Sequence, residues 1–253
     1  MDLTDSELLR YSRQIMLPDF GIEAQERLLT CRALVIGAGG LGSAAAIYLA
    51  AAGIGGLIIA DHDTVDLSNL QRQILHGTAD LGRPKVDSAR ERLREINPAL
   101  EIIALAARLE GQALERQVRD ADIVIDASDN FTTRFAINIA CVLNGTPLVS
   151  GAAIRYEGQL TVFRSDLATG PCYHCLYQEG IEEEQTCAEN GILAPVVGII
   201  GSLQALEAVK ALTGIGETLC GRLLLFDGKH LEWRTLALKR DPSCRVCSTR
   251  HVS

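Results

Sequence analysis

Four of the eight cysteines occur in two pairs that have the spacing of metal ligands. Cys172 and Cys175 form one C-x-x-C unit, and Cys244 and Cys247 form the other. Each unit presents two thiolates from one tight turn, and together they complete the tetrahedral shell of a structural zinc. No coordination position stays open for a substrate, so we expect this zinc to brace the chain. Separate thiol pairs or disulfides are the alternative.

The remaining cysteines suggest no second ligand set. His174 lies inside the first C-x-x-C unit and is a less favoured ligand than the thiolates. Cys31, Cys141 and Cys220 have apolar or ordinary neighbours, which is typical of small core residues. Met1–Arg10 is acidic and polar, without the layout of an export signal, so we expect a cytoplasmic, reducing setting.

A glycine-rich turn is the second group of residues that could do chemistry. It consists of Gly37, Gly39, Gly40 and Gly42. The turn follows the apolar run Ala33–Gly37 and opens the predicted helix Leu41–Ala52, which is the context that a G-x-G-x-x-G motif requires. Such glycines let backbone amides approach a phosphate. Asp61 ends the next predicted strand, where a carboxylate accepts hydrogen bonds from ribose hydroxyls.

The glycine motif alone indicates only a nucleotide or dinucleotide, and its default interpretation is an NAD-dependent oxidoreductase. A polar segment further on favours a triphosphate. It consists of Ser68, Asn69, Leu70, Gln71, Arg72 and Gln73. Arg72 and the later Lys85 supply fixed positive charge, which can hold phosphates and stabilise charge at phosphorus. The alternative is an exposed polar loop with solvated side chains.

Asp129 and Asn130 come directly after the predicted strand Ile123–Ala127. Ligands of open parallel sheets bind at the carboxyl ends of the strands, and a carboxylate there can hold Mg²⁺ against phosphate oxygens. Either residue could instead cap the helix that starts at Phe131, and both roles are compatible.

The elements that must position these residues alternate between strands and helices. Apolar runs without alternation predict a parallel sheet covered on both faces, that is, a Rossmann-like doubly wound α/β fold. The predicted strands are 33–37, 57–60, 102–104, 123–127 and one starting at 148, and the predicted helices are 3–14, 24–29, 41–52, 85–96, 112–118 and 131–143.

Beyond residue 150 the pattern changes. Gln159–Phe163 alternates as an antiparallel strand does, Val196–Leu212 is an apolar helix, and a hairpin around Gly228 closes the chain. We expect one domain over residues 1–253. It comprises an N-terminal helical arm (1–30), a nucleotide-binding half (31–150) and a half that holds the zinc (151–253).

Charge and hydropathy exclude two classes of protein. The net charge of -8 supplies no basic field for nucleic acid. Ala33–Ala60 has no charged residue and is long enough to span a bilayer, but its glycines divide it into strand, helix and strand. We therefore expect neither a nucleic-acid binder nor a membrane protein.

Taken together, these residues resemble the MoeB/ThiF family, the bacterial relatives of ubiquitin-activating enzymes, over essentially the whole chain. The motifs that carry the resemblance are Arg10-Tyr11-Ser12-Arg13-Gln14, the glycine turn, Asp61, the segment 68–73, Lys85, Asp129-Asn130 and the two cysteine pairs. The resemblance implies a homodimer that binds ATP and Mg²⁺ and carries a structural zinc. It implies attack of a ubiquitin-like sulfur carrier's C-terminal glycine carboxylate on the α-phosphorus, with loss of pyrophosphate and later sulfuration to a thiocarboxylate.

Residue roles follow from the same resemblance. Gly40 and its neighbours would lie under the phosphates, and Asp61 would hold the ribose. Asn69, Arg72 and Lys85 would contact the triphosphate, and Asp129 would bind Mg²⁺. Arg13 would reach into the partner subunit's site as an arginine finger.

Cys187 is a candidate catalytic residue only on one side of the family. A cysteine at this position forms a covalent link to the carrier in ThiF-like members and is dispensable in MoeB-like members. Residues 150–159 resemble the MoeB side, which would make the carrier the small subunit of molybdopterin synthase. Residues 226–234 resemble the ThiF side, whose carrier serves the thiamine pathway. The sulfur donor, a cysteine desulfurase or rhodanese type, would be a separate protein.

Two functions from other classes compete with adenylation. An NAD-dependent oxidoreductase would leave Arg72, Lys85 and Asp129 without a role. A non-catalytic, zinc-braced scaffold that binds a ubiquitin-like tail would need the zinc but no nucleotide.

Overall fold

The computed structural model describes residues 3–167, 170–178 and 191–248. Its centre is one eight-stranded sheet with the strand order β3-β2-β1-β4-β5-β6-β7-β8. The strands are β1 (Arg32–Ile36), β2 (Gly56–Ala60), β3 (Glu101–Leu105), β4 (Ile123–Asp126), β5 (Leu148–Ile154), β6 (Glu157–Phe163), β7 (Arg222–Asp227) and β8 (Glu232–Ala237). Strands β1 to β5 pair in parallel, and β6, β7 and β8 continue the sheet antiparallel. The predicted doubly wound fold with antiparallel C-terminal strands is confirmed.

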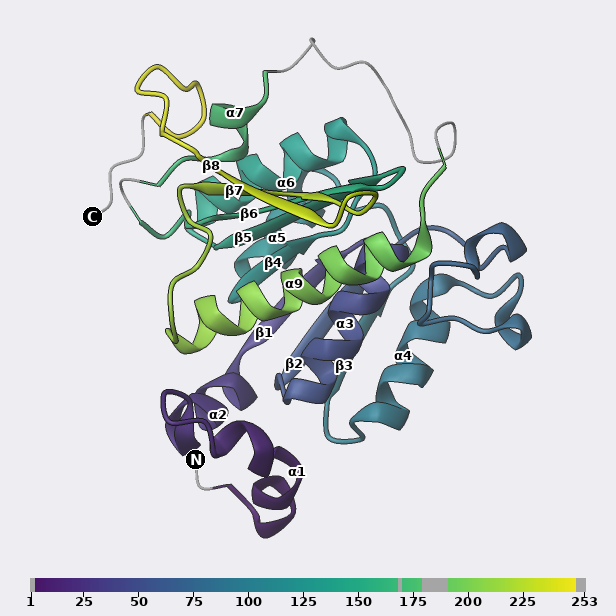
Figure 1. Cartoon of the computed structure of the whole chain (residues 1–253). Helices are drawn as coiled ribbons and strands as arrows, with labels where there is room; N and C mark the ends of the chain where they lie inside the picture. Colours follow the sequence, from purple (N-terminus) through teal and green to yellow (C-terminus); the bar gives the residue numbers. More distant parts are fainter. Residues whose placement is uncertain (1–2, 168–169, 179–190, 249–253) are drawn as a thin grey trace.

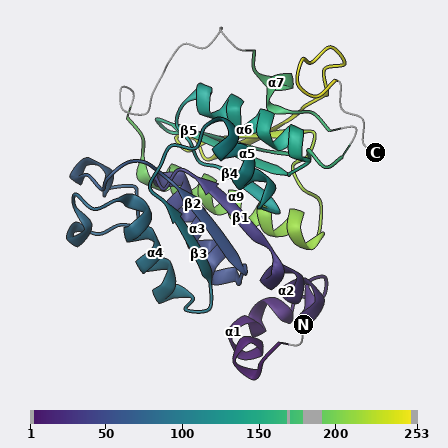
Figure 2. The same cartoon turned by 180° about the vertical axis from the view of Figure 1, so that it is seen from behind.

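Helices cover both faces of this sheet. They are α1 (Asp5–Ile15), α2 (Gly21–Thr30), α3 (Gly40–Ala52), α4 (Lys85–Ile96), α5 (Gly111–Arg119), α6 (Phe131–Asn144), the short α7 (Tyr173–Leu176) and α9 (Ala194–Thr213), with 3₁₀ turns η1 (Leu67–Asn69) and η2 (Thr78–Asp80). Helices α3, α4 and α9 lie on the face seen in Figure 1, and α5 and α6 lie on the opposite face, seen in Figure 2.

The two layers follow from the alternation of side chains along each strand. In β1, Ala33 and Val35 pack into the core beneath α3, α4 and α9, whereas Leu34 and Ile36 pack beneath α5 and α6. Every one of these strand residues is buried, which explains the apolar runs without polar alternation in the sequence.

Helix α9 packs along α3 and against β5 and β6. It is the one helix in the described part of the chain with the length and apolar character to cross a membrane, and half of its most apolar window is buried. Gly201 permits the close crossing, because a Cβ there would lie 2.3 Å from the Leu41 carbonyl oxygen. Its apolar sequence is therefore accounted for by packing inside the fold.

The main departure from the sequence prediction is the length of the β5–β6 hairpin. The sequence predicts only the start of β5 and the residues from Gln159 onward as strand, but the two strands pair from Leu148↔Phe163 to Ile154↔Glu157. The turn between them places Arg155 at φ 54°, a left-handed conformation that is uncommon outside glycine. No glycine, proline or asparagine marks this turn in the sequence.

Two glycines of α9 provide a matched test of the α3–α9 crossing. Gly201→Ala should lower the free energy of unfolding by about 1–3 kcal/mol, because the new methyl group forces the helices apart. Gly198→Ala has no atom within 4 Å of its new Cβ and should raise stability by up to about 1 kcal/mol through helix propensity. Urea titration measures both, and equal effects would contradict the crossing geometry.

Candidate active site

A cavity of about 920 Å³ opens at the carboxyl ends of the parallel strands. The segments that leave β1, β2 and β4 all line it, through the glycine turn, Asp61 and Asp129 respectively. The antiparallel strands supply its other end. The predicted nucleotide residues that line it are Gly37, Gly39, Gly40, Asp61, Arg72, Gln73, Lys85, Asp129 and Asn130.

Three of the four glycines in the turn, Gly37, Gly40 and Gly42, have no room for a side chain. Gly37 has φ +97°, and a Cβ there would lie 2.7 Å from the Ala127 carbonyl oxygen. A Cβ at Gly42 would lie 1.9 Å from the Gly37 carbonyl oxygen, so this glycine serves the packing of α3 on the turn and does not line the cavity. In the described chain no side chain caps α3, which leaves its first amides available to an anion.

Asp61 is half-buried and already bound to two backbone amides. Its Oδ2 accepts from Ala38 N–H at 2.7 Å, and its Oδ1 accepts from Asp63 N–H at 2.8 Å. Each carboxylate oxygen keeps a second lone pair, so the group can still accept hydroxyl donors such as those of a ribose. The two amides hold the carboxylate in a fixed orientation at the cavity wall.

Arg72 and Lys85 are two of the cationic side chains that line the cavity, together with Arg108, Arg134 and Arg234. Lys85 is 4% exposed, and its Nζ donates to Asp63 Oδ2 at 2.8 Å. Burial raises the pKa of Asp63, but the Lys85 hydrogen bond and charge outweigh it, and the pKa lies below its usual value. Arg72 donates to the Ser68 carbonyl oxygen at 3.1 Å, which orders its side chain beside the glycine turn.

Other members of the polar segment are placed differently. Gln73 is buried, and its Oε1 has no hydrogen-bond partner among the described residues, so it is free to accept from a ligand in the cavity. Ser68, Asn69, Leu70 and Gln71 do not line the cavity. The Ser68 hydroxyl donates to Asp66 at 2.5 Å, and Asn69 donates to Ser68, which shapes the turn that carries Arg72.

Asp129 and Asn130 divide the two roles that the sequence left open. The Asn130 side chain accepts from Thr133 N–H at 2.9 Å and caps α6. Asp129 is exposed at the cavity, where its carboxylate contacts only the Asn130 amide, at 3.3 Å, among the contacts that the structure describes. Oxygen ligands of this kind suit Mg²⁺, which keeps several waters and is held by one or two carboxylates.

A buried network that sequence reasoning missed supports this turn. Asp126 is fully buried and accepts from the Ser128 and Ser150 hydroxyls at 2.6 and 3.1 Å. Arg134, also buried, donates to the Ser128 carbonyl oxygen at 2.7 Å. Gln204 of α9 donates to the Asp126 carbonyl oxygen at 2.7 Å. The only sequence signal was a set of polar residues beside an apolar strand.

The structure does not bring Arg13 to the cavity of its own chain. Arg13 is exposed on α1, and α2 ends directly before β1 begins, so both helices lie at the amino end of the sheet (Figure 1). The cavity lies at the opposite end of the strands, where their carboxyl ends meet. Cys187 lies outside the described residues.

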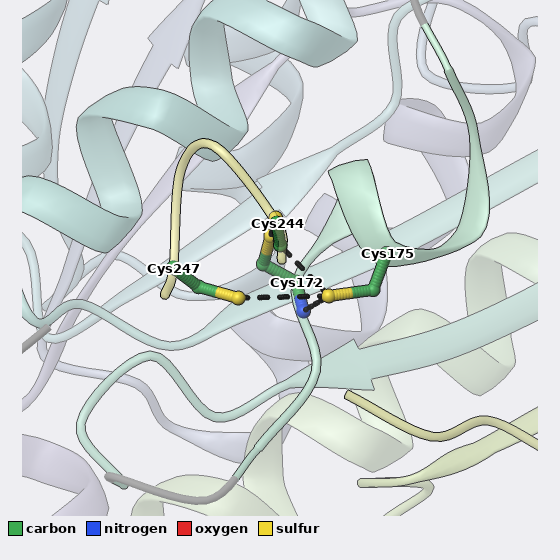
Figure 3. Close-up of side chains that lie close together, drawn as sticks. All are labelled: Cys172, Cys175, Cys244 and Cys247. Carbon is green, nitrogen blue, oxygen red and sulfur yellow. Dashed lines mark hydrogen bonds between the residues drawn. The ribbon is translucent and has the colours of Figure 1, made fainter. Parts of the chain in front are cut away.

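The four predicted metal ligands converge, as Figure 3 shows. Their sulfur atoms all lie within 4.8 Å of one another, with 3.6 Å between Cys172 and Cys244 and 3.5 Å between Cys175 and Cys247. Zinc–sulfur bonds of about 2.3 Å in a tetrahedron require sulfur separations near these values. A hydrogen bond from Cys172 and the amide of Asp241 hold the pKa of Cys175 well below its usual range. The cluster fits a structural zinc.

Helix α6 connects the cysteine cluster to the cavity. Asn138 accepts from Tyr173 N–H at 2.8 Å and bonds the His174 Nδ1 at 2.9 Å. His174 is thereby held by α6 and does not belong to the group of converging sulfur ligands. The same helix begins beside Asp129, so the cysteine loop and the cavity are positioned by one rigid element.

These features define a Rossmann-type α/β protein with the loop geometry of nucleotide-binding folds and a four-cysteine metal cluster. A model of the ThiF family matches residues 11–246, so the chain belongs to the ThiF family. Two relatives from Escherichia coli K12 match over 97% of the chain. A sulfur carrier protein ThiS adenylyltransferase is 49% identical and covered over 97% of its length. A molybdopterin-synthase adenylyltransferase is 47% identical and covered over 98%.

Longer relatives and solved structures agree on the fold. The chain matches 55% of a pig adenylyltransferase and sulfurtransferase MOCS3 at 46% identity, with 98% of the chain covered. Escherichia coli MccB in a crystal structure with ATP has a TM-score of 0.81 at 22% identity, over 96% of this chain and 75% of that one. A crystal structure of PaaA has a TM-score of 0.80 at 25% identity, and the match covers 94% of this chain and 76% of that one.

The division of roles between Asp129 and Asn130 can be tested by stability alone. Asn130→Ala should cost about 1 kcal/mol, because α6 loses its cap. Asp129→Ala should stay within about 0.5 kcal/mol of the wild type, because its side chain is exposed and caps nothing. Thermal or urea unfolding measures both changes, and a larger loss for Asp129→Ala would reverse the assignment.

Proposed function

We propose that this chain adenylates the C-terminal glycine of a ubiquitin-like sulfur-carrier protein, consuming ATP and releasing pyrophosphate. One observation carries the proposal most directly. Arg72 and Lys85 face the same cavity as Asp129, with the glycine turn between the segments that carry them. Two cationic side chains and a carboxylate that can bind Mg²⁺, placed around one anion-binding turn, suit a triphosphate. A nicotinamide site would leave Arg72, Lys85 and Asp129 without a role.

In this proposal the chain's own residues bind and orient the reactants. The glycine turn and the start of α3 lie against the phosphates, Asp61 accepts from the ribose, and Arg72 and Gln73 form the wall beside them, on the turn that Ser68 and Asn69 shape. Arg72 and Lys85 stabilise the charge that develops as the carrier carboxylate attacks the α-phosphorus, and Lys85 keeps two N–H donors beyond the one bonded to Asp63. Asp129 would hold Mg²⁺, and the bound ion would supply positive charge to balance that of the leaving pyrophosphate.

The carrier tail would enter from the end of the cavity formed by β6, β7 and β8. Glu157, Gln159, Phe226 and Arg234 line that end. Members of both segments that resemble one branch of the family or the other, residues 150–159 and 226–234, therefore line the same cavity. We take the small subunit of molybdopterin synthase as the first candidate carrier and the thiamine-pathway carrier ThiS as the second, since the 47% and 49% identities of the named relatives do not separate them.

The position of Arg13 bears on how copies of the chain assemble. Arg13 lies at the amino end of the strands, opposite the cavity of its own chain, so it can act as an arginine finger only in the cavity of a second copy. We therefore propose a homodimer. The enzyme would work in the cytoplasm as a single adenylation domain, with a separate cysteine desulfurase or rhodanese-type donor supplying sulfur. Cys187 is proposed as a covalent acceptor of the carrier only if the carrier is ThiS.

Carrier-dependent exchange of pyrophosphate into ATP tests the function. The wild type should catalyse exchange with one of the two carriers, and Arg72→Ala or Asp129→Ala should reduce it by about a hundredfold or more while the fold remains. Arg92→Ala, an exposed α4 arginine paired with Glu95, is the control and should keep full exchange. NADH binding without exchange would reject adenylation, and tail binding without ATP binding would favour the scaffold.

Metal analysis tests the cysteine cluster. We expect one zinc per chain, which is lost in Cys244→Ser together with a lower melting temperature, because a structural zinc contributes directly to folding. Cys31→Ser is the matched control, since Cys31 packs at the edge of the main core and should leave the zinc content unchanged. A metal-free protein with full stability would remove the bracing role.

A further inference from the structure

His76 is a buried histidine that none of the roles above uses. It is 8% exposed and lies between the glycine turn and α4. Its Nε2 is 3.0 Å from the Ala38 carbonyl oxygen, and its Nδ1 is 2.9 Å from the Ser88 hydroxyl. Both ring nitrogens are therefore bonded to segments that border the cavity.

The Ala38 carbonyl fixes the position of one proton on the ring. A carbonyl oxygen only accepts, so the Nε2 that faces Ala38 carries a proton, and Nδ1 shares a hydrogen bond with the Ser88 hydroxyl. Burial lowers the pKa of His76, the Ala38 hydrogen bond raises it, and the Lys85 charge lowers it again, with a net value below the usual range. The neutral ring is thus the resident form at neutral pH.

The Ala38 peptide is consequently held on both sides. Its N–H donates to Asp61 at 2.7 Å, and its carbonyl oxygen accepts from His76 at 3.0 Å. Ala38 is 1% exposed, so its carbonyl would be left buried and unpaired without the histidine. These two bonds set the orientation of the peptide between Gly37 and Gly39, in the middle of the turn proposed to face phosphate.

The same residue reaches both cationic segments. Its backbone N–H donates to the Gln73 carbonyl oxygen at 3.1 Å and closes the turn that follows Arg72. Ser88 lies on α4 one turn after Lys85, so the Ser88 bond ties His76 to the helix that presents Lys85. His76 therefore connects the glycine turn, the turn that carries Arg72, and helix α4.

We infer that His76 is a positioning residue for nucleotide binding, which holds the glycine turn, the Arg72 turn and the start of α4 in the arrangement that receives ATP. The inference rests on the proposed function only in that the cavity binds ATP. It assigns His76 no contact with the nucleotide and no proton transfer.

Direct titration with ATP and Mg²⁺ tests the inference without any carrier. His76→Phe keeps the ring volume and loses both hydrogen bonds, and its Kd for ATP should rise by about tenfold, the factor that corresponds to about 1.4 kcal/mol. His76→Gln should recover most of the affinity, because the amide N–H can replace Nε2–H toward Ala38. Ser88→Ala should weaken binding in the wild-type background and add little in the His76→Phe background, because the Ser88 bond to the ring is already lost there.

Thr146→Val is the matched control for general loss of stability. Thr146 is also buried and donates to a backbone carbonyl, that of Val118 at 3.1 Å, at the amino end of β5 away from the cavity. This variant should lower the melting temperature and leave the Kd for ATP within about twofold of the wild type. A His76→Phe protein that behaves in the same way would overturn the positioning role.

The failures of the two proposals are distinguishable. A wild type that binds no ATP would overturn the nucleotide site and this inference with it. A wild type that binds ATP, with Kd unchanged in His76→Phe, would overturn this inference alone. If His76→Phe does not fold, Ser88→Ala decides the question, and an unchanged Kd in that variant counts against the role.

Discussion

The contact between the first turn of α3 and the backbone of Gly37 is the constraint on which the site depends. A single additional carbon at Gly42 would lie 1.9 Å from the Gly37 carbonyl oxygen, so the helix can start where it does only because that carbon is missing. The contact fixes the start of α3 directly above the end of β1. The helix amides then face the same cavity as Asp61 and Asp129, which the parallel pairing of β2 and β4 with β1 brings to this end of the sheet.

A glycine also permits a close backbone approach where α9 crosses α3. Gly201 brings the α9 backbone against Leu41, which belongs to the first turn of α3. Val197 of α9 then lies over Gly40, where an added Cβ would be 2.9 Å from its Cγ2. The wall of the cavity is therefore built by backbone approaches between elements that are far apart in the sequence, and these approaches require the small residues of the two helices.

Sequence patterns predicted those parts of the structure that local chemistry determines. Helix α4 has the bounds expected for it, because Pro84 precedes it and Asn97-Pro98 ends it. The converging cysteines were predicted because two C-x-x-C units in one chain are typical of a metal site. Arg134 and His76 were not predicted, since their importance comes from burial against Ser128 and Ala38, and neither contact leaves a trace in the sequence. The sharp turn at Arg155 was missed for the same reason, because its residues carry no turn signal.

The cysteine cluster joins positions that are 72 residues apart, and with zinc bound it is a cross-link. A cross-link of this kind shortens the unfolded chain as a disulfide does, but its closure is reversible and depends on mass action. Free zinc would shift the folding equilibrium in proportion to the logarithm of its concentration, and protons would compete for the same sulfur atoms. The abundance of folded protein would then be linked to the metal supply of the cell.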